Sequence, residues 1–259
     1  MCTVSWAATA GGYELFCNRD ERRTRAAAQA PTVRRSRGVR FVAPTDAEAG
    51  GTWIAANEYG LTLCLLNRYA EDEPQAAGEF RSRGLLLPEL ISLRDTAEVV
   101  RAVGCASLSQ FRPFTMLALA ADAPPAAACW TGRRLLVCEE GGDSLMPLTS
   151  SSFDSTEVVR ERVKLFQGMS AGHLSPAAEL LMRFHHSHEP ERGPFSVCMH
   201  RPEASTVSFS RVKVSPVSIE FCYRPGPPCE GARGVRVCLP RPAGRLEASR
   251  WKRSGEAFV

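Results

Sequence analysis

The chain has 259 residues, of which 44% are hydrophobic and 23% are charged, and its net charge is +4. This is an ordinary globular composition, long enough for one large domain. The mild charge, with arginines spread along the chain, argues against a nucleic-acid partner. No apolar run is long enough for an integral membrane segment. The N-terminus lacks the pattern of a secretory signal, so we expect a cytoplasmic protein.

The N-terminal part predicts two β-hairpins. Residues 3–10 and 13–18 are β-rich runs joined by Gly11-Gly12, a typical two-residue turn. The arginine- and alanine-rich stretch 21–37 has no clean period and predicts an exposed loop. Residues 52–56 and 61–66 then predict a second hairpin, which ends at the polar residue Asn67.

The middle of the chain predicts helices, with further strands between and after them. Asp95 and Asp154 are each followed three residues later by a glutamate, a pattern typical of helix N-termini. The helices are expected at 84–93, after Asp95, at 154–166 and from Ser175 to Phe184, and the strands at 114–121, 126–130, 135–138 and within 195–223.

This order of elements predicts the overall class. Strands, then helices, then strands favour a layered α/β sandwich over alternating βαβ units. The domain is expected to span residues 1–229, because a Pro-Gly-Pro-Pro run at 225–228 breaks regular structure. Residues 230–259 are basic and rich in proline and glycine, which is typical of a loosely attached or disordered tail.

Ten cysteines and five histidines give no metal-site pattern. None of the cysteines forms a Cys-x-x-Cys pair, and most have apolar neighbours, so buried reduced thiols are expected. His185, His186 and His188 cluster after a helix and His200 follows later, but their spacing matches no zinc site. A solvated helix end is the expected role of the cluster, and we predict no metal ion.

Cys2 is the first residue with a chemical implication. Removal of Met1 before a small residue would place a thiol and a free α-amine on Cys2. The amine has a reference pKa near ~8 and the thiol near ~8.5, so the amine can help to deprotonate the sulfur. A cysteine at position two is, on its own, more often an accident of sequence than a nucleophile.

The tetrad Asn18-Arg19-Asp20-Glu21 strengthens the case for Cys2. If the first hairpin pairs about Gly11-Gly12, Cys2 lies opposite the far end of the second strand, near Arg19 and Asp20. Arg19 would favour the thiolate, and Asp20 would orient the ammonium group. A polar cluster that simply closes a hairpin is the alternative.

These motifs together resemble the NRDE family of the Ntn-hydrolase superfamily, which includes the transport and Golgi organisation proteins. The resemblance rests on Cys2, the tetrad and the Gly50-Gly51-Thr52-Trp53 block, with further matches at 57–61, 66–67, 82–86 and 205–207. It covers most of the chain to about Cys229. It implies a four-layer αββα sandwich of two antiparallel sheets between helical layers, an α+β fold.

The resemblance also implies residue roles. Cys2 would be the nucleophile, supported by Arg19 and Asp20, and Asn67 would donate its amide to the oxyanion, worth on the order of 3 kcal/mol. The binding residues would be Asn18, Glu21, Trp53 and Ser150. Ser150 or a neighbour stands where relatives have an asparagine, and this shorter side chain weighs against amidase activity. Arg201 and Arg211 are alternatives for a late arginine of the family.

Two functions therefore stay open. The first is an N-terminal-cysteine hydrolase or acyltransferase that acts on an amide or thioester of a small-molecule acyl substrate and needs no cofactor. The second is a non-catalytic haem or lipid-handling protein on the same scaffold, in which a histidine or cysteine would ligate haem. Fold alone does not decide between them. An interaction protein with buried cysteines is a third option.

Overall fold

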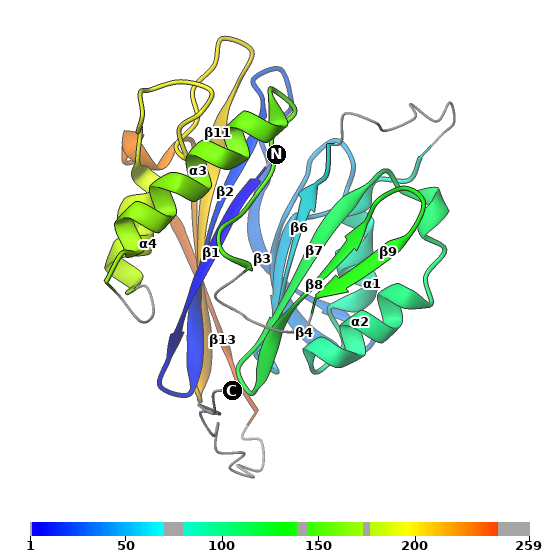
Figure 1. Cartoon of the computed structure of the whole chain (residues 1–259). Coiled ribbons are helices and arrows are strands. Elements are labelled where there is room, and N and C mark those ends of the chain that lie inside the picture. The colour runs from blue at the N-terminus through cyan, green and yellow to red at the C-terminus, as the bar shows by residue number, and fades with distance from the viewer. Residues whose placement is uncertain (1, 70–79, 139–144, 173–176, 243–259) are drawn as a thin grey trace, which may run out of the picture.

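The computed structural model describes residues 2–69, 80–138, 145–172 and 177–242. Within them the chain forms two antiparallel sheets that face each other, with helices on both outer sides (Figure 1). This is the αββα sandwich that the family resemblance implies, and the layers are formed by elements in the order strands, helices, strands.

The first sheet carries the N-terminus. Its strand order is β10-β1-β2-β11-β12-β13. The bounds are β1 Cys2–Thr9, β2 Gly12–Arg22, β10 Leu148–Thr149, β11 Ala204–Val214, β12 Ser218–Pro225 and β13 Val235–Pro240. Because β1 and β2 lie in the interior of the sheet, most of their residues are buried.

The second sheet follows the chain order, β3-β4-β5-β6-β7-β8-β9. Its strands are β3 Gln29–Ser36, β4 Val39–Thr45, β5 Ile54–Asn57, β6 Thr62–Asn67, β7 Phe114–Ala120, β8 Ala123–Trp130 and β9 Leu135–Cys138. Most of these strands follow one another through short connections, and the long connection between β6 and β7 contains the helices of this layer.

Helices cover the outer faces of the two sheets. On the first sheet lie α3 (Ser155–Ser170) and α4 (Ala178–His186), and on the second lie α1 (Leu86–Leu90) and α2 (Thr96–Gly104) (Figure 1). Short 3-10 turns are η1 (Arg83–Leu85), η2 (Leu108–Gln110) and η4 (Pro228–Glu230). One apolar cluster fills the space between the sheets and under α3 and α4, and a second lies between the second sheet and α1 and α2.

Both acidic helix caps are confirmed. The side chain of Asp95 accepts a hydrogen bond from the backbone N–H of Glu98 at 2.7 Å, and that of Asp154 accepts one from Glu157 at 3.4 Å. The cap predicted at Ser175 lies outside the described residues. The helix predicted at 84–93 is shorter than expected, since it divides into η1 and α1.

The first hairpin confirms the predicted pairing. Its turn is at residues 10–11, one residue before the predicted Gly11-Gly12, and the register places Cys2 opposite Arg19 and Thr3 opposite Asn18. The second strand is longer than predicted, because β11 pairs with it along its whole length and extends it to Arg22.

Two segments predicted as irregular are strands. The predicted loop 21–37 contains β3, an edge strand in which Pro31 is buried while most of its neighbours are exposed. The predicted tail was also wrong in part, because β13 pairs with β12 through six residues. Its alternating Val-Arg-Val-Cys-Leu run is typical of a strand with one buried face. The division of the chain near Cys229 stays a prediction.

His185 corrects another expectation. The ring is fully buried instead of solvated, and it lies between Ser5, at 2.9 Å from Nε2, and Asn18, at 3.1 Å from Nδ1. Burial lowers the pKa of His185 to about 3, so the ring is neutral. The His185 ring is buried because the last turn of α4 faces the sheet.

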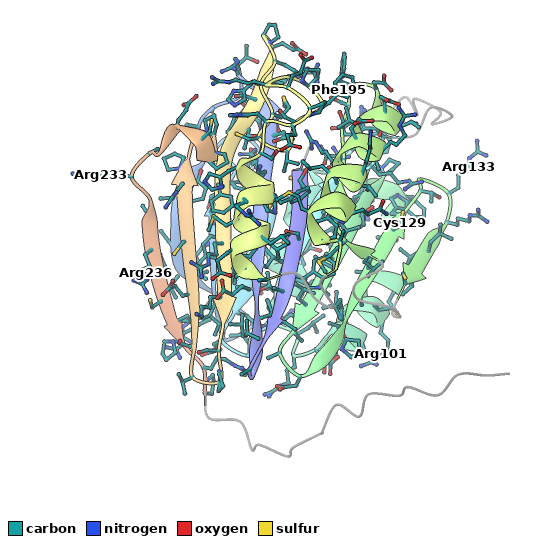
Figure 2. All side chains as sticks on the ribbon, turned by 60° about the vertical axis from the view of Figure 1, so that its left-hand side comes forward. Arg101, Cys129, Arg133, Phe195, Arg233 and Arg236 are labelled. Atoms are coloured by element: carbon teal, nitrogen blue, oxygen red, sulfur yellow. The ribbon has the colours of Figure 1, made fainter. Side chains whose placement is uncertain are left out.

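The charged side chains lie mainly at the outside of the molecule. Figure 2 labels Arg101, Arg133, Arg233 and Arg236, which are exposed at separate places on the periphery. These four arginines have the solvated role expected from the sequence, whereas Arg19 and Arg162 are buried. Among the described helices, none combines the length and apolar character needed to cross a membrane.

Candidate active site

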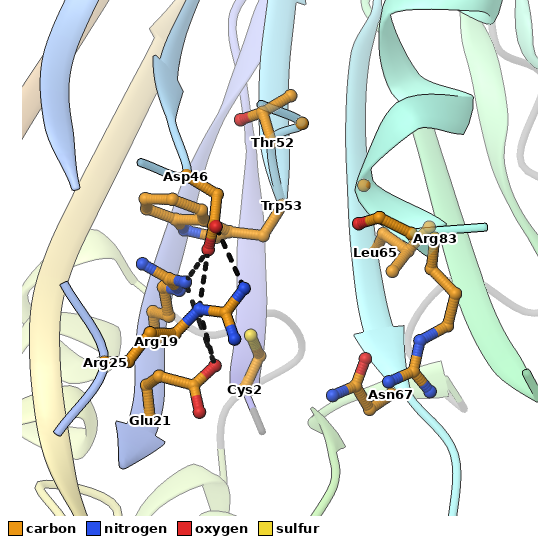
Figure 3. Close-up of a pocket in the computed structure, with 13 residues that line it drawn as sticks. Cys2, Arg19, Glu21, Arg25, Asp46, Thr52, Trp53, Leu65, Asn67 and Arg83 are labelled. Atoms are coloured by element: carbon orange, nitrogen blue, oxygen red, sulfur yellow. Dashed lines mark hydrogen bonds and ion pairs between the residues drawn. The ribbon is translucent and has the colours of Figure 1, made fainter. Parts of the chain in front are cut away.

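A cavity of ≈ 140 Å³ opens beside the N-terminal end of β1. Figure 3 shows its two walls, with Cys2 and the side chains of β2 on one side and Asn67 and Arg83 on the other. The lining residues are Cys2, Arg19, Glu21, Arg25, Asp46, Gly51, Thr52, Trp53, Leu65, Asn67, Ser82, Arg83 and Gly84. Of the eight site residues predicted from sequence, five line this cavity.

Strand alternation decides which residues of the tetrad reach the cavity. Successive side chains of a strand point to opposite faces. Arg19 and Glu21 therefore face inward with Cys2, which is paired opposite Arg19. Asn18 and Asp20 face outward, toward the layer of α3 and α4.

Arg19 is held by three partners in the cavity wall. Its Nη2 forms an ion pair with Asp46, its Cζ lies 4.1 Å from the centre of the Trp53 ring, and Glu21 lies 3.8 Å from Nη2. Asp46 therefore balances the positive charge of Arg19 that was expected to act on the Cys2 thiol. The indole Nε1 of Trp53 is buried without a hydrogen-bond partner among the described residues.

Asp46 links two arginines at the floor of the cavity. Arg25 forms a two-point contact with its carboxylate, with both distances 2.9 Å. Burial acts to raise the pKa of Asp46. Hydrogen bonds from Arg25 and from the backbone N–H of Ala49, with the charges of Arg19 and Arg25, outweigh it and lower the pKa to about 2. The carboxylate is therefore charged at neutral pH.

The Cys2 thiol is buried and protonated at rest. Its side chain is 5% exposed and lies in the inter-sheet core. A hydrogen bond with Cys17 and burial raise the pKa of Cys2 well above its usual value, and the charge of Asp20 acts in the same direction. Reaction at this sulfur therefore requires a base that removes the proton.

Ser150 lies at the backbone of Cys2. The Cys2 backbone nitrogen donates to Ser150 Oγ at 3.2 Å, and the Ser150 N–H donates to the Cys2 carbonyl at 3.0 Å. Ser150 is buried and follows β10, the edge strand that pairs with β1. The position predicted for binding therefore contacts the nitrogen that would become the α-amine.

The opposite wall presents an amide and a guanidinium group. Asn67 ends β6, and its Nδ2 donates to Tyr69 Oη at 3.0 Å. Arg83 lies beside it, with Nη1 donating to the carbonyl of Pro113 at 2.8 Å. Figure 3 shows both side chains facing the wall that carries Cys2.

Two glycine-containing motifs meet behind this wall. A Cβ on Gly51 would lie 2.5 Å from the carbonyl carbon of Gly84, and the Thr52 N–H donates to the Gly84 carbonyl at 3.0 Å. Only glycine permits this approach of two backbones. The contact explains why Gly51-Thr52-Trp53 and Arg83-Gly84 both reach the cavity.

The outward-facing residues of the tetrad belong to a buried network. Asp20 accepts hydrogen bonds from Thr206 Oγ1 at 2.7 Å and from Arg162 Nη1 at 3.3 Å. Arg162 also donates to Thr3 Oγ1 at 2.8 Å. Asn18 Nδ2 donates to two backbone carbonyls of the outer layer. Asn18 and Asp20 thus brace β2 from behind.

Several site residues were not predicted. Asp46, Arg25 and Arg83 come from segments between strands, where the sequence has no periodic pattern to mark them. Neither candidate for the late arginine lines the cavity, because Arg211 pairs with Glu14 at 2.5 Å and Arg201 pairs with Glu203. The fully buried arginine nearest to the Cys2 strand is Arg162, from α3.

Solved structures that are similar to this one have the same arrangement of layers, which is the Ntn-hydrolase fold. Penicillin V acylase from Agrobacterium tumefaciens is 11% identical, with a TM-score of 0.56 over 92% of this chain and 86% of that one. The mutant C2A conjugated bile acid hydrolase from Clostridium perfringens is 14% identical, with a TM-score of 0.52 over 92% of each chain. The N-acylethanolamine-hydrolyzing acid amidase ortholog of Caenorhabditis elegans is 13% identical, with a TM-score of 0.53 over 82% and 92%.

The family follows from the sequence itself. The model of the Transport and Golgi organisation 2 family matches residues 1–192, about three quarters of the chain. The protein belongs to this family. No curated protein sequence matches significantly.

Proposed function

We propose that this protein is an N-terminal-cysteine hydrolase or acyltransferase that acts on an amide or thioester carbonyl. The observation that carries the proposal is the position of Cys2, at the head of β1, in a cavity wall, and opposite Arg19. The amidase and acylase names of the similar structures support hydrolysis as the reaction class.

Removal of Met1 supplies the base in this proposal. The free α-amine of Cys2 takes the thiol proton as Sγ forms a bond to the carbonyl carbon. The resulting ammonium group returns the proton to the leaving nitrogen or sulfur as the carbon–nitrogen or carbon–sulfur bond breaks. Water or another acceptor then attacks the acyl-enzyme with the amine again as base, and Cys2 is released as a thiol.

Ser150 positions the amine in this proposal. Ser150 Oγ lies 3.2 Å from the Cys2 nitrogen and accepts a hydrogen bond from it, which orients the lone pair that would take the thiol proton. Asp20 lies on the outer face of β2, where its carboxylate is paired with Arg162, so its part is to support the strand that is paired with β1.

Asn67 is the candidate oxyanion donor. Its amide group is the neutral donor of the wall opposite Cys2, and a neutral amide stabilises developing negative charge without titrating. The Tyr69 hydroxyl oxygen accepts a hydrogen bond from this amide and orients it. The second Nδ2 proton is then free for the substrate oxygen.

A neighbouring groove suggests where the larger part of the substrate lies. It measures ≈ 340 Å³ and shares Arg19, Glu21 and Arg25 with the cavity. Apolar residues form much of its wall, namely Ala26, Ala27, Ala28, Val207, Tyr223, Pro225 and Pro227, and Arg22, Arg23, Ser205 and Thr206 also line it. We propose that the reacting carbonyl enters the polar cavity while an apolar acyl or leaving group occupies the groove.

The haem or lipid alternative has less support at this site. Pockets for larger ligands usually measure roughly 300–1,000 Å³, whereas the cavity at Cys2 measures ≈ 140 Å³. Binding of haem would need the adjoining groove and a ligand atom directed into it. The hydrolase proposal needs only groups that already line the cavity.

Activity toward a panel of amides and thioesters with apolar acyl groups tests the proposal. Cys2→Ala is expected to lower turnover by about 10⁴-fold or more, because the nucleophile is lost. The buried methyl group should leave the thermal unfolding of the variant close to wild type. Equal turnover by wild type and Cys2→Ala would contradict the mechanism.

A further inference from the structure

Four side chains far apart in the sequence meet on the outer side of the first sheet. They are His188, Cys198, His200 and Cys229, and their ligand atoms all lie within 4.8 Å of one another. They come from the segment after α4, the loop before β11 and the turn η4. In Figure 1 this turn is orange and lies below the yellow loop at the left edge.

The separations match a tetrahedral metal site. His200 Nε2 lies 3.3 Å from His188 Nε2 and 3.5 Å from the sulfur atoms of Cys198 and Cys229. Zinc–nitrogen bonds of about 2.0–2.1 Å and zinc–sulfur bonds of about 2.3 Å place neighbouring tetrahedral ligands about 3.3–3.8 Å apart. The three distances to His200 Nε2 thus have the spacing of a zinc shell, and the remaining pairs of ligand atoms lie within 4.8 Å.

Hydrogen bonding alone explains this convergence poorly. A neutral imidazole nitrogen offers either one proton or one lone pair. His200 Nε2 has three polar neighbours, so it satisfies only one of them well. A central cation uses the lone pairs of all four ligands at once.

We propose that this cluster is a structural Zn²⁺ site with two cysteine and two histidine ligands. Two thiols each lose a proton on binding, so the two thiolates balance the charge of the ion. Four protein ligands complete the tetrahedral shell and leave no position for substrate, as is typical of structural zinc. Haem iron takes its protein ligands at axial positions, so four convergent atoms fit a bare ion instead.

The backbone around the ligands is already fixed. The Cys198 N–H donates to the Ser187 carbonyl at 3.0 Å, and the His200 N–H donates to the Gly193 carbonyl at 3.2 Å. Ser196 Oγ donates to the Cys198 carbonyl at 2.8 Å. A site held by its supporting contacts loses little entropy when the metal binds.

One neighbouring group has to move. Ligation through His200 Nε2 leaves the ring proton on Nδ1, which lies 3.4 Å from Arg192 Nη2. The Arg192 side chain is 58% exposed and also pairs with Glu230 at 3.8 Å. It can therefore turn toward Glu230 at little cost.

The site would brace the support behind the candidate active site. Val197, next to Cys198, accepts a hydrogen bond from Asn18 at 2.9 Å. The Met199 N–H donates to Thr206 Oγ1, which in turn donates to Asp20. A zinc ion at Cys198 and His200 would hold the loop that carries both contacts.

The sequence predicts no metal site because the ligands lack close spacing. Cys198 and His200 are two residues apart, but His188 lies ten residues before Cys198 and Cys229 lies 29 residues after His200. Only the return of the chain through β11 and β12 brings η4 beside α4.

Metal analysis of the full chain, purified under reducing conditions from zinc-supplemented culture, tests the proposal. We expect about one zinc per chain after gel filtration in wild type, in Cys2→Ala and in Cys105→Ser, an exposed cysteine far from the cluster. Cys229→Ser and His200→Ala should each lose most of this zinc. Cys229 is exposed in a short turn, so its substitution is not expected to prevent folding.

Cobalt gives an independent reading of the ligands. Apo protein titrated with Co²⁺ should develop thiolate-to-cobalt charge-transfer absorption and the strong visible bands of tetrahedral cobalt, and Cys229→Ser should change both. Chelation of the zinc should lower the melting temperature of wild type but not of His200→Ala. Wild type without stoichiometric zinc, zinc retained by both variants, or a Cys198–Cys229 disulfide in the reduced preparation would overturn the proposal.

Discussion

The two faces of β2 carry the same motif into different environments. The inner face presents Arg19 and Glu21 to a solvent-accessible cavity beside Cys2. The outer face presents Asn18 and Asp20 to a closed layer, where both side chains are fully buried and hydrogen-bonded. Four consecutive residues are therefore divided between a reaction site and its support.

This division separates two kinds of contribution. On the inner face, substitution should change chemistry more than stability, because the side chains contact open space. On the outer face, substitution should change stability first, because it leaves buried polar groups without partners. The following predictions test this contrast, from the largest expected effect to the smallest.

Arg162→Met tests the outer face. Arg162 pairs with Asp20 where both side chains are almost fully buried, so the substitution removes a cation that balances the buried carboxylate. Breaking such a pair typically costs about 3–5 kcal/mol, measured as the free energy of unfolding in denaturant. Arg160→Met, in the same helix but 67% exposed, is the control and should change stability by less than about 0.5 kcal/mol. Similar values for the two variants would contradict the network.

Asn67→Ala tests the inner face. Loss of an oxyanion donor is expected to slow acylation by about 10²–10³-fold, while the half-buried side chain contributes little to stability. Tyr69→Phe keeps the amide and removes only its partner, so it should retain most of the rate. Unfolding of Asn67→Ala, or equal rates for both variants, would make Asn67 a structural residue.

The pH dependence of Cys2 modification tests the resting state of the thiol. The hydrogen bond that the Cys2 thiol donates to Cys17, together with burial, raises the pKa of Cys2, so the thiolate fraction increases with pH throughout the neutral range. Alkylation should accelerate by about tenfold per pH unit between pH 6 and 8. Cys17→Ala removes the larger cause and should increase the rate at pH 7. Exposed Cys105 in the same molecule is the reference, and a rate at pH 6 equal to that at pH 8 would indicate a preformed thiolate.

Asp46 gives the smallest expected effect. Its pKa is depressed to about 2, below the reference value of 3.8, so its contribution to stability is present above pH 4 and is lost as the pH falls toward 2. Over this pH range, the free energy of unfolding of wild type should fall by on the order of 1 kcal/mol more than that of Asp46→Asn. Asp122→Asn, at an 81% exposed side chain, is the control and should behave as wild type.

The sequence predicted the parts of the site that depend on local rules. The glycines at positions 11 and 12 predicted a tight hairpin, which brings Cys2 to the far end of the second strand, near Arg19. The observed turn lies one residue earlier, at residues 10–11, and this shift places Cys2 opposite Arg19. Because successive side chains of a strand point to opposite faces, the Asp20 side chain points away from the cavity. The sequence-based prediction placed Asp20 near the Cys2 sulfur because it did not distinguish the inner from the outer face of this strand.

The remainder depended on contacts that no local pattern reveals. Asp46 and Arg83 reach the cavity through segments whose direction is set by packing, including the close contact of Gly51 with Gly84. His185 was expected in solvent because it ends a helix, but the polar groups of Ser5 and Asn18 make a buried position possible. Strand β3 was missed because its arginines and proline obscure an edge-strand pattern.

Intact-mass analysis of the purified protein, before and after brief exposure to a limiting thiol-reactive acyl probe, tests the central claim most directly. The account predicts a protein that lacks Met1 and carries one acyl group, which peptide mapping assigns to Cys2 among the ten cysteines. Retained Met1, or labelling of Cys2 no faster than that of exposed Cys105, would contradict an N-terminal nucleophile.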